Sequence, residues 1–344
     1  MIGPARRPDG GNGLRIVLIG LGAVGVRVAR HLLGQPGTQV GSILILARDA
    51  RAVARTEGMG AAVSVGPIRG ARIPEGTDVV VIARPDDATA LASDALRAGA
   101  HVVAALDDPH HVRHLLALDR TARAGGLSVA VGTTMAPGLS CVLARYGACF
   151  LDEVHQIHVA GYGTGGPACA RRHHAALSSI ATDWYDGAWR RRQGGTGREL
   201  MWFPPPVGAA DCYRGRLVDP VLLAPAFPGV RRVSARMAAT RRDRLSAPLP
   251  MLRPPHPEGL VGAARVELRG TRDGVHETLI FGSAGRPSLV AGTVAGVAAV
   301  WAATGRFARA GAAGLAEMVD EPGAFLREVA QRGITLSAFE GAIG

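Results

Sequence analysis

Side chains that could exchange a proton or bind a carboxylate are concentrated between residues 107 and 214. Imidazoles titrate near neutral pH, and a tyrosine at the end of a strand can donate a hydrogen bond. The planar fork of an arginine matches a carboxylate with two hydrogen bonds. The predicted catalytic residues are Tyr162, His173, His174 and Asp107. The predicted substrate-binding residues are Arg171, Arg172 and Arg214.

Each of these residues also has a purely structural interpretation, which the sequence leaves open. A single arginine is commonly a solvated surface residue, and a single histidine or tyrosine is commonly held by backbone hydrogen bonds. The four cysteines form no CxxC pair and have no metal-type spacing with histidine. We expect them to be reduced, small, buried residues, and we predict no metal site. They are Cys141, Cys149, Cys169 and Cys212.

A glycine-rich turn near the N-terminus is typical of dinucleotide binding. The β-branched run Arg15–Ile19 leads directly into GLGAVG at positions 20–25, and an amphipathic helical stripe follows. Gly20 permits a tight turn, Gly22 lets the backbone approach a pyrophosphate, and Gly25 lets the helix pack closely on the strand. The free N–H groups of the helix start would add partial positive charge. The residues predicted to bind the cofactor here are Gly20, Gly22, Ala23, Val24 and Gly25.

The residues after the second predicted strand bear on which cofactor is used. An NAD site usually carries an acidic residue at this strand end, whereas Ser42–Ala47 is followed by Arg48, Asp49 and Arg51. Arg48 can hold a 2′-phosphate and stack on adenine, which favours NADP. Asp49 would favour NAD if it took the ribose instead. The prediction is therefore NADP, with NAD as the alternative.

Apolar runs continue to alternate with amphipathic helices, which predicts a parallel sheet covered on both faces. The further predicted strands are Asp78–Ala83, His101–Leu106 and Leu127–Val131. Ligands of such sheets bind at the carboxyl ends of the strands, and Asp107 belongs to this crevice. The other residues predicted to bind the cofactor are Arg84, Pro85, Thr133, Pro137 and Gly138.

With the glycine turn, the sequence GTTMAPGLS at 132–140 resembles the saccharopine dehydrogenase-like family of NAD(P)-dependent oxidoreductases, saccharopine reductase type. GYGTGGPA at 161–168, DGAW at 186–189 and FPGV at 227–230 are similar as well. The likeness covers most of residues 14–336. It implies a Rossmann domain, an inserted α/β domain on which dimers often form, and chemistry on an imine or an opine-like secondary amine.

The order of elements is also similar to that of glucose-fructose oxidoreductase-type sugar dehydrogenases. That family has a Glu-Lys-Pro step with a catalytic lysine after the strand equivalent to His101–Leu106. This chain reads Ala-Leu-Asp-Asp at 105–108, and all 39 of its basic residues are arginine. A lysine catalyst is therefore excluded, and with it any Schiff-base chemistry on lysine.

The predicted fold class is α/β: a Rossmann doubly wound parallel sheet with an inserted α+β substrate and dimerisation domain. Within the insert, residues 163–215 show little regular patterning, and the apolar stretch 288–304 is expected to be a core helix. The predicted insert strands are Val154–Gly161, Val230–Ala235, Ala264–Leu268 and Thr278–Phe281. The predicted parts are a flexible tail (1–13), the Rossmann domain (14–135), the insert (136–285) and C-terminal helices returning to the Rossmann domain (286–344).

Composition excludes several classes of protein. The chain has 344 residues, of which 47% are hydrophobic and 19% charged, so wholesale disorder is excluded and two domains are expected. The net charge of +11 comes from arginines scattered along the chain, and we therefore predict no nucleic-acid partner. No apolar signal segment is found at the N-terminus, and the longest apolar stretch, Leu289–Ala303, is short for a bilayer span. We expect a soluble cytoplasmic homodimer with no membrane partner.

The sequence thus predicts an NAD(P)-dependent oxidoreductase that transfers hydride to an imine or carbonyl next to a carboxylate. Two alternatives stay open. One is another small-metabolite carbonyl dehydrogenase that shares only the cofactor domain. The other is a non-catalytic NAD(P)-binding redox sensor.

Overall fold

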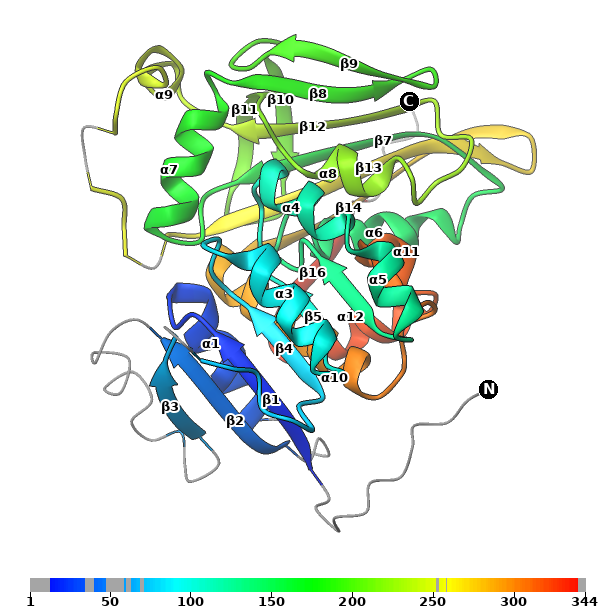
Figure 1. Ribbon diagram of the computed structural model, residues 1–344. Coiled ribbons are helices and arrows are strands. Elements are labelled where there is room, and N and C mark those ends of the chain that lie inside the picture. Colours follow the sequence, from blue (N-terminus) through cyan, green and yellow to red (C-terminus); the bar gives the residue numbers. More distant parts are fainter. Residues whose placement is uncertain are drawn as a thin grey trace.

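The structure is a computed structural model, and it consists of two sheets with helices against them (Figure 1). It describes residues 13–34, 40–47, 59, 63–68, 71–251, 254–257 and 259–339. The second sheet lies across the carboxyl ends of the strands of the first (Figure 1).

The first sheet has seven parallel strands in the order β3-β2-β1-β4-β5-β6-β15. Its members are β1 (Leu14–Ile19), β2 (Val40–Ala47), β3 (Val63–Pro67), β4 (Val79–Ile82), β5 (His101–Ala104), β6 (Ser128–Val131) and β15 (Gly311–Gly314). Apart from β15 this is the Rossmann order, in which the strand order reverses between β1 and β4 and leaves a crevice there. The predicted doubly wound parallel sheet is confirmed.

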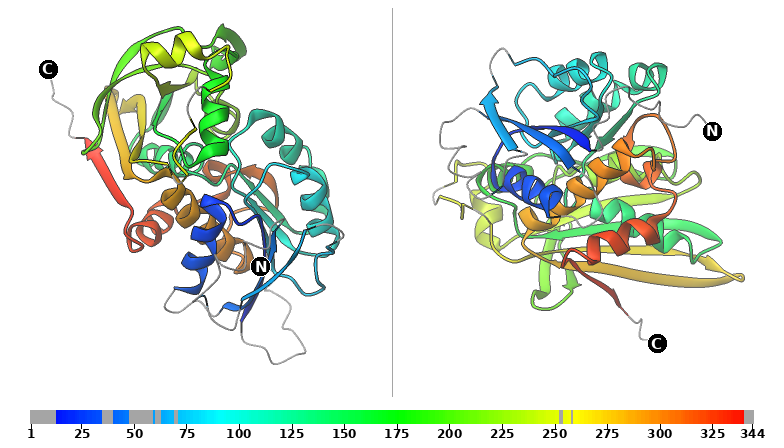
Figure 2. Two further views of the ribbon diagram at one scale, coloured as in Figure 1. Left: turned by 90° about the vertical axis from the view of Figure 1, so that its left-hand side faces the viewer. Right: turned by 90° about the horizontal axis from the view of Figure 1, so that it is seen from below.

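Helices cover both faces of this sheet, because its strands are apolar on both sides. One face carries α1 (Ala23–Leu33) and α10 (Pro287–Ala303), and the other carries α3 (Ala88–Arg97), α4 (Pro109–Leu116) and α5 (Asp119–Ala124) (Figure 2). All four residues of β4 are fully buried.

The apolar helix α10 packs against α1 as well as against the sheet. A Cβ at Gly292 would lie 2.5 Å from the Cβ of Arg27, and one at Gly296 would lie 2.2 Å from Cδ2 of His31. These two glycines therefore allow the helices to approach closely, as expected for a core helix. None of the described helices combines the length and the apolar character needed to cross a membrane.

The second sheet is mixed and follows the path β10-β11-β12-β7-β13-β14-β16, with β8 and β9 attached beside β12. Its strands are β7 (Glu153–Tyr162), β8 (Ile180–Tyr185), β9 (Ala188–Gln193), β10 (Glu199–Phe203), β11 (Gly208–Arg214), β12 (Arg232–Ala238), β13 (Gly262–Arg272), β14 (Val275–Gly285) and β16 (Thr335–Phe339). The remaining helices are α6 (Leu139–Ala148), α7 (Pro167–Ala176), α8 (Asp219–Leu223), α9 (Arg241–Ser246), α11 (Leu315–Met318) and α12 (Pro322–Ala330). Helix α6 packs on β13 and β14 from the side of the first sheet.

Two expectations differ from the structure. Residues 163–215 contain α7 and the strands β8 to β11. Strand β9 is exposed along almost its whole length, and β8 fully buries only Ala181, so neither strand shows the apolar alternation by which a strand is recognised. Residues 286–344 were expected to be helical, but they also contain two strands: β15 pairs with β6 of the first sheet, and β16 pairs with β14 of the second.

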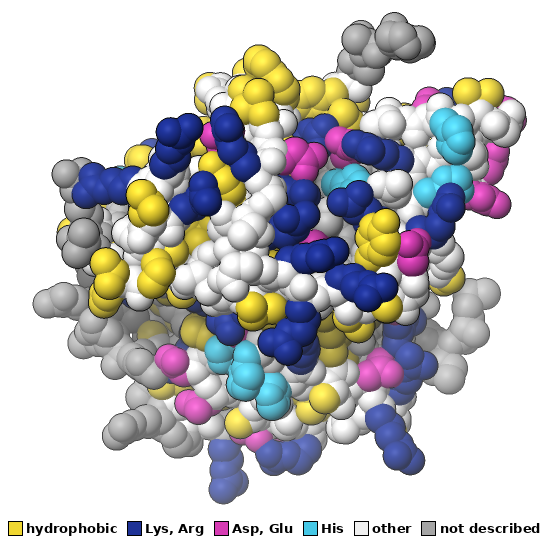
Figure 3. Space-filling view, turned by 90° about the horizontal axis from the view of Figure 1, so that it is seen from above, with side chains coloured by type: hydrophobic (Ala, Val, Ile, Leu, Met, Phe, Trp, Pro, Cys, Tyr) yellow, Lys and Arg dark blue, Asp and Glu magenta, His cyan; other side chains and the backbone are white. Residues whose placement is uncertain are grey.

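Arginines are spread over the outer face of the second sheet, with acidic side chains between several of them (Figure 3). In this sheet, Nη2 of the buried Arg236 lies 2.9 Å from Oε2 of Glu199, and just before β10 Nε of Arg198 lies 2.9 Å from Oδ1 of Asp211. Part of the positive charge of the second sheet is therefore neutralised by neighbouring carboxylates.

A buried acid joins α8 to α6 behind the crevice. Asp219 is only 2% exposed, and its Oδ1 accepts a hydrogen bond of 2.6 Å from Ser140 Oγ. Burial raises its pKa to about 6, although the Ser140 hydrogen bond acts in the opposite direction. The folded chain therefore binds this proton more tightly than the unfolded chain does.

We predict that Asp219→Asn stabilises the protein at neutral pH. The contribution of a raised carboxyl pKa is present below the ordinary value of 3.8 and is lost as the pH rises through about 6. An asparagine keeps the acceptor for Ser140 without the charge. In denaturant titrations, the unfolding free energy of the variant minus that of wild type should be about 2–3 kcal/mol larger at pH 7.5 than at pH 4, which means a more stable variant at neutral pH. An equal difference at both pH values would contradict this.

Candidate active site

The glycine turn between β1 and α1 lies at the crevice of the first sheet. Gly20 has φ +97°, and a Cβ there would lie 3.2 Å from the carbonyl oxygen of Ala83 and 3.1 Å from Cβ of Arg84. A Cβ at Gly25 would lie 2.0 Å from the carbonyl oxygen of Gly20, so only glycine allows this turn. A Cβ at Gly22 would meet no atom within 4 Å. The backbone at Gly22 is therefore open on the side where a ligand would approach.

The start of α1 offers N–H groups to such a ligand. The first helical hydrogen bond runs from Val26 N to Gly22 O at 3.1 Å, and no side chain caps the helix. The N–H groups of Ala23, Val24 and Gly25 therefore have no partner within the helix. The open backbone and these N–H groups together fit a pyrophosphate.

The loop after β6 forms the wall opposite. Thr134 donates a hydrogen bond of 2.7 Å from Oγ1 to the carbonyl oxygen of Pro137, and Gly138 has φ +127° with its Cβ position 2.3 Å from the carbonyl oxygen of Thr134. Pro137 and Gly138 thus shape the loop. Thr133 is fully buried, and its Oγ1 has no hydrogen-bond partner within the described structure. Its neighbour Thr134 is the residue that lines the pocket.

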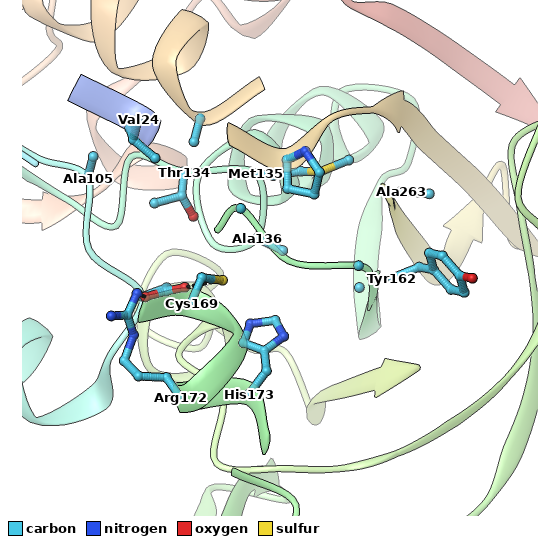
Figure 4. A pocket seen from close by; sticks show the side chains of 16 residues that line it. Val24, Ala105, Thr134, Met135, Ala136, Tyr162, Cys169, Arg172, His173 and Ala263 are labelled. Carbon is cyan, nitrogen blue, oxygen red and sulfur yellow. Dashed lines mark hydrogen bonds and ion pairs between the residues drawn. The ribbon is translucent and has the colours of Figure 1, made fainter. Parts of the chain in front are cut away.

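This wall and the helix α7 enclose a pocket between the two sheets (Figure 4). The pocket has a volume of about 80 Å³ and borders on a larger chamber of about 770 Å³. Gly161, Tyr162, Gly163 and His173 line both spaces. Val24, next to the glycine turn, lines the smaller one.

Four polar side chains meet in the pocket. Arg172 pairs with Oδ1 of Asp107, and Cys169 Sγ donates a hydrogen bond of 3.3 Å to Oδ2 of the same carboxylate. Asp107 comes from the loop between β5 and α4, whereas Cys169, Arg172 and His173 come from one face of α7, where spacings of three and four residues coincide. Figure 4 shows these three α7 side chains together on one side of the pocket.

The charges of this group follow from its surroundings. Burial acts to raise the pKa of Asp107, but the charge of Arg172, the charge that His173 carries only at acid pH, and two hydrogen bonds hold this pKa below the ordinary value. Burial, helped by the charge of Asp107, raises the pKa of Cys169, so the thiol keeps its proton. Burial lowers the pKa of His173 despite Asp107, so its ring is neutral at neutral pH. The pocket therefore holds one ion pair, a neutral thiol and a neutral imidazole.

The other predicted site residues on the second sheet and α7 lie apart from this group. Tyr162 lines the pocket, but its hydroxyl points away from the α7 side chains (Figure 4). His174 Nε2 lies 3.0 Å and 2.9 Å from the carbonyl oxygens of Ser246 and Leu249, which gives the ring a structural role. Arg171 is exposed. Arg214 Nε lies 3.6 Å from Asp183 Oδ2, outside the pocket lining.

The predicted cofactor residues of β4 lie beside the glycine turn. The Cβ of Arg84 lies where it would be 3.1 Å from a Cβ built on Gly20, and Nη2 of Arg84 pairs with Oδ2 of Asp86 at 2.7 Å. Pro85 follows it and is half-buried. Arg48 and Asp49, on which the choice between NADP and NAD depends, lie outside the described residues.

Cys169 was expected to be a small buried residue, whereas the structure places it half-buried in the pocket with a hydrogen bond to Asp107. The signal was its place on α7: Cys169 lies three residues before Arg172 and four before His173. The helix starts at Gly166-Pro167, so the three side chains had to share one face.

Comparisons with known proteins bear on the fold. No protein-family model matches the sequence, and no curated protein matches it significantly. Among solved structures, the chain is similar to saccharopine dehydrogenase (L-Glu forming) from Saccharomyces cerevisiae, with a TM-score of 0.69 and 13% identity over 95% of this chain and 100% of that chain. It is also similar to homospermidine synthase from Legionella pneumophila, solved in complex with NAD, with a TM-score of 0.70 and 14% identity over 95% of this chain and 91% of that one.

At these identities the comparisons concern the fold alone. Both matches span nearly the whole chain, so they include the first sheet and the mixed second sheet together. The chain therefore has a saccharopine dehydrogenase-like fold.

Proposed function

We propose that the chain is an NAD(P)-dependent oxidoreductase that transfers hydride to an imine or carbonyl carbon next to a carboxylate. The observation that carries this proposal is the position of one pocket. The pocket lies at the carboxyl ends of the parallel strands, extends from the glycine turn at Val24, and contains Asp107, Cys169, Arg172 and His173. Ligands of doubly wound sheets bind at this place.

The glycine turn would hold the pyrophosphate of the cofactor through the N–H groups of Ala23, Val24 and Gly25. Arg84 and Pro85 beside it, and the loop shaped by Pro137 and Gly138, would border the rest of the dinucleotide. When bound, the nicotinamide ring would supply or accept the hydride. Two proteins of similar fold were solved with such cofactors: the homospermidine synthase with NAD, and an engineered D-amino acid dehydrogenase with NADP+, the latter at a TM-score of 0.50. NADP stays our preferred cofactor because of Arg48.

Arg172 is the residue of this chain that we propose to bind the substrate carboxylate. Its Nε is buried in the pocket wall and has no hydrogen-bond partner within the described structure. Its Nη2 is held by Asp107, which fixes the plane of the guanidinium. An acceptor oxygen in the pocket would satisfy the free Nε–H, and a carboxylate is the best match in charge.

His173 is the group that would exchange a proton with the reacting nitrogen or oxygen. Its imidazole is neutral, so it can accept a proton released when the reaction runs as an oxidation, and in a reduction it would pass on a proton taken up from solvent in the larger chamber. The thiol of Cys169 keeps its single proton and donates it to Oδ2 of Asp107, so it would orient this carboxylate. The larger chamber beyond His173 would receive the part of the substrate that does not react.

A first prediction concerns cofactor binding. Gly22→Ala adds a methyl group where the pyrophosphate would lie, and its φ of −81° suits alanine. We expect NADPH and NADH to bind at least about tenfold more weakly, measured by titration of protein fluorescence and by the ligand-induced rise in melting temperature. Gly323→Ala on α12 is the matched control, because its added Cβ makes only ordinary contacts of 3.5 Å or more. Unchanged affinity in Gly22→Ala would place the cofactor elsewhere.

A second prediction concerns the substrate. NADPH oxidation is followed with 2-oxo acids, with and without a primary amine, and with amides of the same acids. Arg172→Met should raise KM for the acids by about ten- to hundredfold and leave KM for the amides nearly unchanged, because one charged hydrogen bond is lost. Arg171→Met, one residue away and exposed, should change neither.

Two outcomes of this assay would contradict the assignment. If only Arg171→Met lost the preference for 2-oxo acids over their amides, the residue that binds the substrate carboxylate would be Arg171, on the exposed face of α7. Cofactor binding without oxidation by any of these compounds would contradict the proposed reaction and favour a redox sensor.

A further inference from the structure

Three different donor atoms converge at one end of the pocket. They are a carboxylate oxygen of Asp107, the sulfur of Cys169 and a ring nitrogen of His173, and all lie within 4.8 Å of one another. We propose that they form a three-ligand site for Zn²⁺ or a chemically similar divalent cation, with a fourth coordination position open to the pocket. Carboxylate, thiolate and imidazole are the ligands that zinc accepts, and three protein ligands with one open position are typical of sites that act on bound molecules.

The distances suit such an ion. Cys169 Sγ and Asp107 Oδ2 lie 3.3 Å apart. Zinc bonds of about 2.3 Å to sulfur and about 2.0–2.2 Å to oxygen, at a tetrahedral angle, require a separation of about 3.5 Å. His173 lies one helical turn after Cys169 on the same face of α7, so both point to the same place. Only small side-chain shifts would therefore bring the three atoms around one cation.

The residues around the ligands hold them in place. Arg172 pairs with Oδ1 of Asp107 and leaves Oδ2 to face Cys169. The next residue, Asp108, caps α4 by accepting a hydrogen bond of 2.9 Å from His110 N, which anchors the loop that carries Asp107. Partners of this kind orient the ligands of metal sites and commonly contribute tenfold or more to affinity.

The charges balance when the metal binds. The cation takes the place of the thiol proton, which passes to the solvent, and a Zn–S bond forms. The two positive charges of the ion are then matched by the thiolate and by the carboxylate of Asp107, while the imidazole is neutral. Arg172 stays paired with the other carboxylate oxygen. The fourth position is left for water or for an oxygen or nitrogen of a ligand in the pocket. With the cation bound, His173 is a ligand and exchanges no proton, and a metal-bound water would take that role.

A second group of possible ligands, Asp108 with His110 and His111, is explained without a metal. Oδ1 of Asp108 accepts from the backbone N–H groups of both histidines, and His110 is exposed. That arrangement is a helix start with a side-chain cap. The group at Cys169 has no such local explanation, because Asp107 comes from a different sheet.

The test is a Co²⁺ titration of the full chain without dinucleotide, in a reductant that does not bind metals. We expect a thiolate-to-Co²⁺ charge-transfer absorption that saturates at one equivalent and disappears when Zn²⁺ is added. Cys169→Ser should abolish the absorption, whereas Cys149→Ser should keep it, because Cys149 is exposed at the end of α6. His173→Gln should weaken Co²⁺ binding by at least about tenfold.

The proposal is overturned if the wild-type chain shows no such absorption, or if the absorption persists in Cys169→Ser. It is also overturned if His173→Gln binds Co²⁺ as tightly as wild type, a comparison that holds even if the serine variant fails to fold. Melting temperatures of all variants are measured alongside. The metal site does not rest on the proposed function. Because the Co²⁺ titration contains no dinucleotide, a failure to bind Co²⁺ leaves the cofactor proposal intact. Weak NADPH binding, in turn, leaves the metal-site proposal intact.

Discussion

The ion pair between Asp107 and Arg172 links the two sheets at the place where the pocket forms. Asp107 follows a strand of the first sheet, and Arg172 lies on the helix that follows β7 of the second. Removing either partner would leave a charge poorly compensated in a half-buried place, which costs far more than an exposed ion pair contributes. The pair therefore fixes how α7 sits above the crevice, and with it the positions of Cys169 and His173.

The geometry of the glycine turn and of the parallel sheet around it could be predicted from the sequence, because it depends on short-range backbone constraints. Gly20, Gly22 and Gly25 lie within one turn, and their roles follow from backbone conformation and close approach at those positions. The parallel strands could be recognised from continuous apolar runs. The hairpin β8–β9 could not, since β9 is exposed on both faces and β8 fully buries only one residue.

The chemical side of the pocket depends on contacts between residues far apart in the chain. Asp107 meets Arg172 across 65 positions, and only the docking of α7 decides which of two neighbouring arginines reaches it. The same docking leaves Arg171 exposed to solvent and places the His174 ring within hydrogen-bond distance of the carbonyl oxygens of Ser246 and Leu249. Cys169 could not be separated from the other cysteines by composition. Cys169 is distinguished by its hydrogen bond to Asp107, which lies far away in the sequence, and not by its spacing to another cysteine.

The central proposal is that one dinucleotide spans the glycine turn and the pocket. A crystal structure of the chain grown with NADP+ or NAD+ tests this most directly. We predict that the pyrophosphate accepts hydrogen bonds from the N–H groups at the start of α1, and that C4 of the nicotinamide faces Asp107, Cys169 and His173. A dinucleotide whose pyrophosphate lies away from the glycine turn, or whose nicotinamide lies outside the pocket, would contradict the account.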